Sequence, residues 1–211
     1  GDITTTGGTL GSISGTGLTR TATFTPTASL ASGSASITVA SGNYTDTAGN
    51  SGGAGTTPSI SIDTLAPTVA SIAISGATGI ASSTLNAGDV VSVTVTMSEA
   101  TTVVTGGGTP TLALNIGGTT VQAAYASGSG SSALVFTYTV LANQTDVNGI
   151  SIGVNSLALN GGTLSDAAGN AATLTHALVA DNAGYLVDTL APTLSITSDV
   201  AAVKVGETAT I

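Results

Sequence analysis

Apolar and polar residues alternate with a period of two along much of the chain. The longest alternating stretches lie at 91–97, 112–116 and 134–140, and shorter ones at 37–39, 60–62, 72–74, 150–154 and 194–196. Because successive side chains of a strand point to opposite faces, each stretch predicts a strand with one buried face. Clusters of Gly, Asn and Pro separate them, and no stretch has the period of a helix. Many short strands whose apolar faces need a second sheet predict an all-β sandwich.

Three short motifs recur in a fixed order, which is the signature of tandem modules. The hexapeptide Asp-Thr-Leu-Ala-Pro-Thr occurs twice without a change. An Asp-x-Ala-Gly-Asn loop precedes each copy, and a Gly followed by an acid leads into a strand after each copy. The three motifs stand at 63–68 and 188–193, at 46–50 and 166–170, and at 88–89 and 206–207.

The order of the motifs predicts how the chain is divided. Residues 64–188 are expected to form one complete module, residues 1–63 the C-terminal part of the module before it, and residues 189–211 the N-terminal strands of the next one. We expect the two partial modules to pack against neighbouring copies, head to tail. Such packing would join modules of one continuous chain or separate subunits that exchange strands, and in either case it would propagate as a filament or tandem array.

Composition and charge exclude several partners. The chain has 211 residues, 41% of them hydrophobic, with a mean hydropathy of +0.47, so it has ample apolar material for packed cores. Only 6% of its residues are charged, and the net charge is −9. Nucleic acids and anionic lipids require clustered Lys and Arg, so neither is expected as a partner. No apolar run approaches the roughly 18–20 residues of a membrane-spanning helix, and membrane insertion is not expected.

The segments 93–100 (VTVTMSEA) and 160–193 (NGGTLSDAAGNAATLTHALVADNAGYLVDTLAPT) carry a family resemblance. They resemble the bacterial immunoglobulin-like domains repeated in tandem along large secreted adhesins and biofilm surface proteins. The resemblance implies an all-β fold of tandem immunoglobulin-like β-sandwich modules, one complete and two partial. It also implies an extracellular location on the bacterial cell surface and the function of a stalk or extender, often stiffened by calcium.

The acidic residues of these motifs suggest a calcium site at the joint between modules. In an immunoglobulin-like sandwich, the loops after the second strand and before the last strand meet at the pole where the chain enters. Glu99, Asp166 and Asn170 should therefore converge on Asp63 of the joint. Mixed carboxylate, amide and carbonyl oxygens suit Ca²⁺ better than zinc or iron. The previous module would contribute Asp46 and Asn50 to a matching half-site, and Asp188 would serve the next module.

Each of these motifs also has a purely structural interpretation. Asp-x-Ala-Gly-Asn is an ordinary tight turn in which Asp and Asn bind nearby backbone groups, and Glu99 is then a solvated acid. Asp89 and Glu207 are favoured as turn or edge charges. Asp146 and Asn148 are favoured as a turn, with a second cation site as the alternative.

The sequence contains little that supports catalysis, and no enzymatic activity is expected. His176 is the only histidine and lies in an expected strand without a recognisable nucleophile motif, so a hydrogen-bonded structural histidine is favoured. Phosphate-binding and zinc-protease motifs do not occur. The stalk function is therefore favoured over a carbohydrate- or receptor-binding module, because sugar sites usually present exposed aromatic side chains and only 3% of the residues are aromatic.

Overall fold

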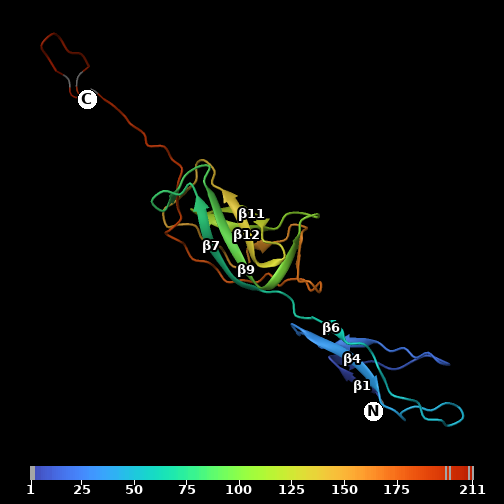
Figure 1. The fold of residues 1–211 in the computed structure, drawn as a ribbon. Helices are drawn as coiled ribbons and strands as arrows, with labels where there is room; N and C mark the ends of the chain where they lie inside the picture. The colour runs from blue at the N-terminus through green and yellow to red at the C-terminus, as the bar shows by residue number, and fades with distance from the viewer. Residues whose placement is uncertain (1–2, 198, 200, 209, 211) are drawn as a thin grey trace.

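The fold is all-β, as the alternating pattern predicts. The computed structural model describes residues 3–197, 199, 201–208 and 210, and Figure 1 shows a central sandwich with a smaller unit at one end and an extended tail at the other. The described residues contain no helix, and therefore none that could cross a membrane. The strands are β1 (Ile3–Thr6), β2 (Gly8–Leu10), β3 (Phe24–Pro26), β4 (Gly33–Val39), β5 (Gly55–Thr56), β6 (Ile60–Ile62), β7 (Val69–Thr78), β8 (Thr84–Leu85), β9 (Val90–Val104), β10 (Thr111–Ile116), β11 (Thr119–Ser127), β12 (Ser131–Thr139), β13 (Thr145–Asp146), β14 (Leu157–Ala158), β15 (Thr163–Ser165) and β16 (Leu186–Asp188).

The central sandwich is built from two sheets. The larger has the order β14-β10-β11-β12-β9-β15, and β7 pairs with the first half of β9. The smaller has the order β13-β16-β8, in which β16 runs antiparallel to β13 and parallel to β8. Two layers with the apolar faces turned inward are what the half-buried strands require.

The core of the central sandwich follows from the alternation along β9 and β12. Val91, Val93 and Val95 of β9 are fully buried, and so are Leu134 and Phe136 of β12. Each such side chain contributes roughly 1.5–3 kcal/mol when it leaves water. The predicted strand at 150–154 is the exception in this region, because it forms only single bridges, at Ser151 and Ile152.

The first hexapeptide joins the N-terminal unit to the central sandwich and is held at both of its ends. On the N-terminal side, the Thr64 hydroxyl donates to the Thr27 carbonyl (2.7 Å). On the other side, the Thr68 amide donates to Ser98 Oγ (2.9 Å), and the Thr173 amide donates to the Pro67 carbonyl (2.8 Å). Pro67 is buried. The joint is therefore part of the fold on both sides and not a loose linker.

Residues 3–64 form a unit with very little core. β4 pairs with β1, β5 and β6 in one small sheet, and β2 pairs with β3 in a hairpin. Among the described residues of this unit, the only buried apolar side chains are Ala35 and Ile62, whereas the central sandwich buries eighteen in one cluster. The small sheet thus leaves much of its apolar face uncovered.

The segment that follows the second hexapeptide forms no strand among its described residues and projects away from the sandwich (Figure 1). The predicted strand at 194–196 is therefore wrong for the isolated chain. A strand needs a neighbour for its backbone groups, and no described strand pairs with this segment. Leu194 and Ile196 remain exposed.

Candidate metal centre

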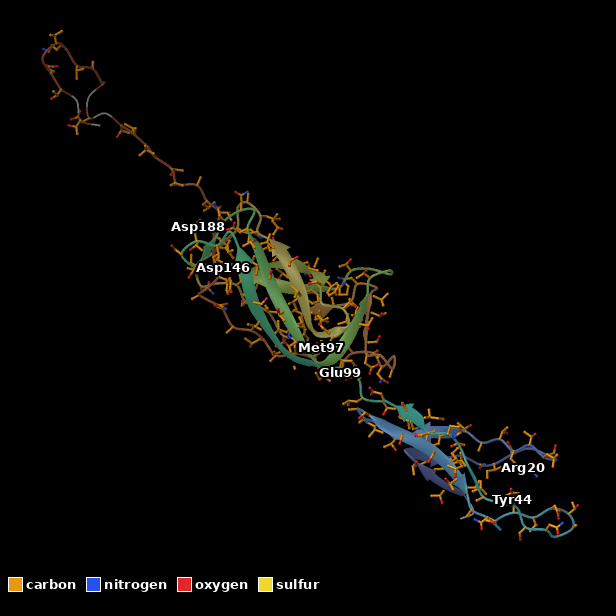
Figure 2. All side chains as sticks on the ribbon, viewed as in Figure 1. Arg20, Tyr44, Met97, Glu99, Asp146 and Asp188 are labelled. Carbon is orange, nitrogen blue, oxygen red and sulfur yellow. The ribbon has the colours of Figure 1, made fainter. Side chains whose placement is uncertain are left out.

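Three carboxylates from distant parts of the sequence meet where the joint reaches the central sandwich. One carboxylate oxygen each from Asp63, Glu99 and Asp166 lie within 4.8 Å of one another. Asp166 is buried, with 5% of its surface exposed, and the other two are half-buried. Figure 2 shows Glu99 at the end of the sandwich that faces the N-terminal unit, which we call the proximal pole. The predicted convergence of these three acids is therefore what the structure shows.

The Asp166–Asn170 loop positions the buried carboxylate. Asp166 Oδ1 accepts the Asn170 amide (2.8 Å), and Oδ2 accepts the Asn170 side-chain amide (2.7 Å). Gly169 takes a φ of 93°, which a residue with a Cβ adopts only with strain. The sequence Asp-x-Ala-Gly-Asn thus closes a tight turn and holds its carboxylate in one orientation.

Asn170 also connects this loop to the joint. Its side-chain nitrogen donates to the backbone carbonyl of Asp63 (3.2 Å), in addition to the bond to Asp166. The Asp63 carboxylate accepts the Leu65 amide (3.1 Å), which fixes the turn of the joint. Asn170 therefore holds Asp63 beside Asp166 through a hydrogen bond, and its role as a direct ligand stays a prediction.

Glu99 reaches the cluster from a strand and not from a loop. A loop after the second strand is predicted for Glu99, but β9 continues without a break from Val90 to Val104. Burial keeps its period of two beyond Met97, with Glu99 half-buried and Thr101 buried. The pairing register with β12 nevertheless shifts here, because Ala133 pairs with Thr96 whereas Ser131 pairs with Thr101. A bulge of this kind re-aims a side chain without ending the strand, which explains why a loop is predicted here.

The cluster carries negative charge without a protein cation to balance it. Burial, and then the neighbouring charges of Asp63 and Asp166, raise the pKa of Glu99 above its ordinary value. The pKa of Asp166 is lowered, chiefly by the side-chain hydrogen bond from Asn170. The two basic residues of the chain are occupied elsewhere: Arg20 donates to Gly17 and Thr19 carbonyls, and Lys204 pairs with Glu207. The repulsion within the cluster is thus left for solvent or a bound cation to relieve.

The geometry fits a calcium ion. Calcium binds oxygen at about 2.3–2.6 Å, so two oxygens on opposite sides of one ion lie at most about 5 Å apart. The 4.8 Å limit on the three carboxylate oxygens meets this condition. Thiolate is absent from the chain, and the lone histidine lies elsewhere, so the donors available are hard oxygens, which favour Ca²⁺ or Mg²⁺ over zinc and iron.

The remaining predicted ligands do not join a cluster of three acids in the part of the chain that the structure describes. Asp46 and Asn50 form a loop with the same bonds as Asp166 and Asn170, including a side-chain bond of 2.8 Å, but this loop is exposed. The Asn50 bond likewise lowers the pKa of Asp46. Asp188 lies at the opposite, distal pole of the sandwich, where its carboxylate accepts the Leu190 amide (3.0 Å) (Figure 2).

The structural interpretation holds for the other acids. Buried Asp146 accepts the backbone amides of Gly117 and Gly149 (2.8 Å each), so its carboxylate closes turns. Asp89 and Glu207 each accept a backbone amide three residues upstream, as expected for turn charges. His176 is hydrogen-bonded, as expected, since its Nε2 accepts the Ser156 amide (2.8 Å). It lies, however, outside any strand.

The described strands form an all-β fold with a two-sheet sandwich, which fits the immunoglobulin-like class. Residues 1–64 match the family model of a bacterial immunoglobulin-like domain. Domains of this family often occur in surface or extracellular proteins and are in general not catalytic. No curated protein and no solved structure matches the chain.

Proposed function

We propose that this chain is a structural module of a bacterial surface protein, in which calcium at the joint holds neighbouring sandwich units in an extended array. The observation that carries the proposal is the composition of the carboxylate cluster. Asp63 belongs to the joint, whereas Glu99 and Asp166 belong to the central sandwich. An ion bound by all three would therefore tie the N-terminal unit to the central one.

A bound ion would stiffen the joint because it would add strong bonds where only single hydrogen bonds and repelling carboxylates are present. Without it, the joint is held by single hydrogen bonds, such as that from Asn170 to the Asp63 carbonyl. The three carboxylates at the same place repel one another, which favours separation of the two units. A divalent cation would reverse the sign of this interaction. Buried Pro67, with its fixed φ, limits the remaining bending.

Calorimetric titration of the chain with Ca²⁺ and with Mg²⁺, combined with small-angle X-ray scattering, tests this function. Calcium should bind with one strong site per chain, and its removal by a chelator should broaden the distribution of particle shapes while the circular dichroism stays unchanged. Glu99→Gln should abolish both effects, and Glu207→Gln, which removes an equal charge from an exposed acid of the tail, should retain them. Scattering that is identical with calcium and with chelator would contradict the proposed function.

A further inference from the structure

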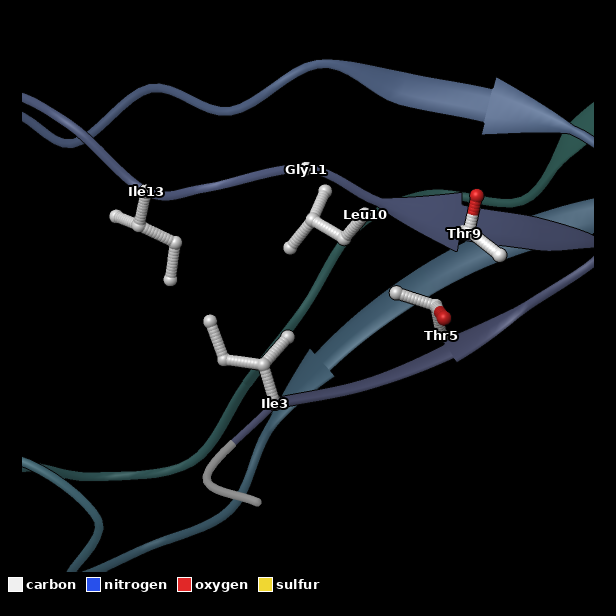
Figure 3. A pocket seen from close by; sticks show the side chains of 6 residues that line it. All are labelled: Ile3, Thr5, Thr9, Leu10, Gly11 and Ile13. Atoms are coloured by element: carbon white, nitrogen blue, oxygen red, sulfur yellow. The ribbon is translucent and has the colours of Figure 1, made fainter.

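The N-terminal unit has an apolar groove beside β1 and β2, and a strand edge at β6 that no described strand pairs with. The groove is lined by Ile3, Thr5, Thr9, Leu10, Gly11 and Ile13. Figure 3 shows Ile3 of β1 facing Leu10 of β2, and Ile13 of the segment after β2, across the opening. β6 (Ile60–Ile62) pairs with β4 on one edge, and no other described strand lies along its second edge.

The central sandwich shows which segment covers the corresponding edge. Its last strand, β16, occupies the place of β6, since β16 ends at Asp188 of the second hexapeptide and β6 ends directly before Asp63 of the first. β16 is paired on both edges, by β13 and by β8, with Leu186 opposite Thr84 and Val187 opposite Leu85 in parallel register. Leu85 is fully buried there. β8 belongs to the opening part of the central module, and no described strand takes the corresponding place beside β6.

The described residues after the second hexapeptide begins have the local structure of such an opening part at two separate points, near Leu190 and near Gly206. The first point is the hexapeptide. The Leu65 amide donates to the Asp63 carboxylate in the first copy, and the Leu190 amide donates to the Asp188 carboxylate in the second. At the later turn, the Glu207 amide donates to the Lys204 carbonyl (3.0 Å), and the Asp89 amide donates to Asn86 in the same way (3.2 Å). Gly206 and Gly88 have φ values of 89° and 94°.

The tail is about seven residues shorter than the opening part of the central module between these two points, so the later turn sets the alignment of the strand beside it. Counting back from the shared turn, Ala202 and Val203 stand where Thr84 and Leu85 stand in β8. Val203 is 53% exposed and Leu85 is 0% exposed. Pro192 of the second hexapeptide is exposed, and its counterpart Pro67 is buried. The tail thus has the side chains of an opening part without the neighbour that would bury them.

We propose that the tail of one copy of this chain docks on residues 3–64 of a second copy and completes its sandwich. In the docked state Ala202 and Val203 pair in parallel with Ser61 and Ile62 of the second copy, as Thr84 and Leu85 pair with Leu186 and Val187. Leu194 adds an apolar side chain from the segment equivalent to β7. This goes beyond the proposed function, because the contact depends on strand pairing and apolar burial and not on calcium.

The same docking has two consequences for the assembly. It places Asp188 of one copy at the Asp46–Asn50 loop of the next, in the relation that Asp63 has to the Asp166–Asn170 loop. It also joins different surfaces of the two copies, so that each added copy presents a new tail. A heterologous contact of this kind grows into a filament unless the rotation closes a ring.

Disulfide trapping between two singly substituted chains tests the register. The protein contains no cysteine, so Ser61→Cys and Ala202→Cys each introduce one thiol. Directly paired residues have Cα atoms close enough for a disulfide, at about 4.4–6.8 Å. Mixed in chelator and oxidised, chains with tags of different mass should form the 61–202 heterodimer in large excess over one between Ser61→Cys and Thr105→Cys, an exposed control position. Equal yields, or no heterodimer, would overturn the proposal.

A second pair of variants tests the burial of the tail. Val203→Asp should raise the concentration at which the chain associates in sedimentation velocity by at least about tenfold, because an unpaired carboxylate would be buried beside Ile62. Val205→Asp, two residues further on, should leave it unchanged, since the equivalent Ala87 is exposed. Both positions are exposed in the isolated chain, so both variants should fold. A monomer at every concentration, or an equal effect of the two variants, would contradict the docking.

Discussion

Asn170 is the residue on which the order of the carboxylate cluster depends most directly. Its side-chain nitrogen donates to Asp166 Oδ2 and to the Asp63 carbonyl, and its backbone amide donates to Asp166 Oδ1. One amide side chain thus orients a carboxylate and fixes the backbone of the joint. Asn50 makes the same bonds to Asp46 without the bond to a joint residue that Asn170 makes in the described part of the chain, so Asn50 provides a matched control.

Asn170→Ala should loosen the joint, and Asn50→Ala should not. In chelator we expect Asn170→Ala to lower the melting temperature of the central sandwich by roughly 2–4 °C and to speed proteolysis at Leu65. Asn50→Ala should change neither quantity. Differential scanning calorimetry and limited proteolysis measure the two effects, and equal behaviour of the variants would show that the bond to Asp63 has no part in the joint.

The pH dependence of the Asn170→Ala effect follows from the lowered pKa of Asp166. The folded state binds the Asp166 proton more weakly than the unfolded state, whose pKa is near 3.8. The stabilisation is therefore present above pH 3.8 and is lost as the pH falls through the lower, folded-state pKa. The difference in stability between Asn170→Ala and the unsubstituted chain should accordingly be largest at neutral pH and shrink below pH 3.8. Denaturant unfolding at several pH values measures it.

Glu99→Gln should have effects of opposite sign without and with calcium. Without calcium, the raised pKa of Glu99 means that the folded state binds its proton more tightly, so stability is highest below the ordinary value of 4.5 and falls as the pH rises through the folded-state pKa. Removing the charge should raise the melting temperature at pH 7 by roughly 1–3 °C. With calcium, the variant should lose the stabilisation that the ion gives the unsubstituted chain. A decrease in both conditions would indicate that Glu99 has a structural role only.

The two copies of the hexapeptide have the same sequence but are buried to different extents. The hexapeptide at 63–68 packs between Ser98 and Thr173, whereas its copy at 188–193 is largely exposed after Thr189. Local sequence sets the Asp turn in both copies. Burial of the proline requires the sandwich that follows.

Substituting the two prolines separates these contributions. Pro67→Ala should destabilise the chain by about 1 kcal/mol, through greater freedom of the unfolded chain and lost packing of a buried ring. Pro192→Ala should have almost no effect on a dilute chain, because Pro192 is exposed. Chemical unfolding of the two variants side by side provides the measurement. An effect of Pro192→Ala as large as that of Pro67→Ala would mean that the tail packs on its own module.

Period-two alternation identifies the strands of the central core well, because one face of each strand is buried against another sheet. It identifies β9 and β12 from Val91, Val93, Leu134 and Phe136. It fails at 194–196, where the pattern is present but no partner strand is, since alternation records a capacity for burial and not the burial itself.

The candidate metal centre could be predicted to a similar degree. The repeat places Asp63 and Asp166 at the same pole, because both stand at fixed positions in their motifs. The sequence gives no signal for the contacts of Ser98 and Thr173 with the joint, which depend on how β9 and the segment after Asn170 pass the hexapeptide. Common hydroxyl residues in a chain rich in Ser and Thr do not reveal which of them are used.

The whole molecule combines units of very different core size. The central sandwich buries a cluster of eighteen apolar residues, and the unit before it buries two, over the described residues. Burial of apolar surface is the main favourable term in folding. The two units should therefore differ in local stability, although both consist of hydrogen-bonded strands.

Hydrogen exchange should reveal this difference directly. In a dilute chain, amides of β1 and β4 should exchange at least about a hundredfold faster than those of β9 and β12, because opening the small unit exposes little apolar surface. Mass spectrometry after deuterium labelling measures the rates peptide by peptide. At concentrations where copies associate, protection of β1, β4 and β6 should increase, and Val203→Asp should prevent the increase. Equal protection of the two units in the dilute chain would contradict the expected difference.

The chain enters the central sandwich through β7 at the proximal pole and leaves it through β16 at the distal pole (Figure 1). A tensile force applied at the two ends therefore acts along both strands. The ladder bonds of β7 with β9 and of β16 with β8 and β13 lie across that direction, so the force loads them in shear and they must break together and not one after another. Rupture of such a module under tension is set by the rate of unfolding rather than by equilibrium stability, which is the property that the proposed surface function would use.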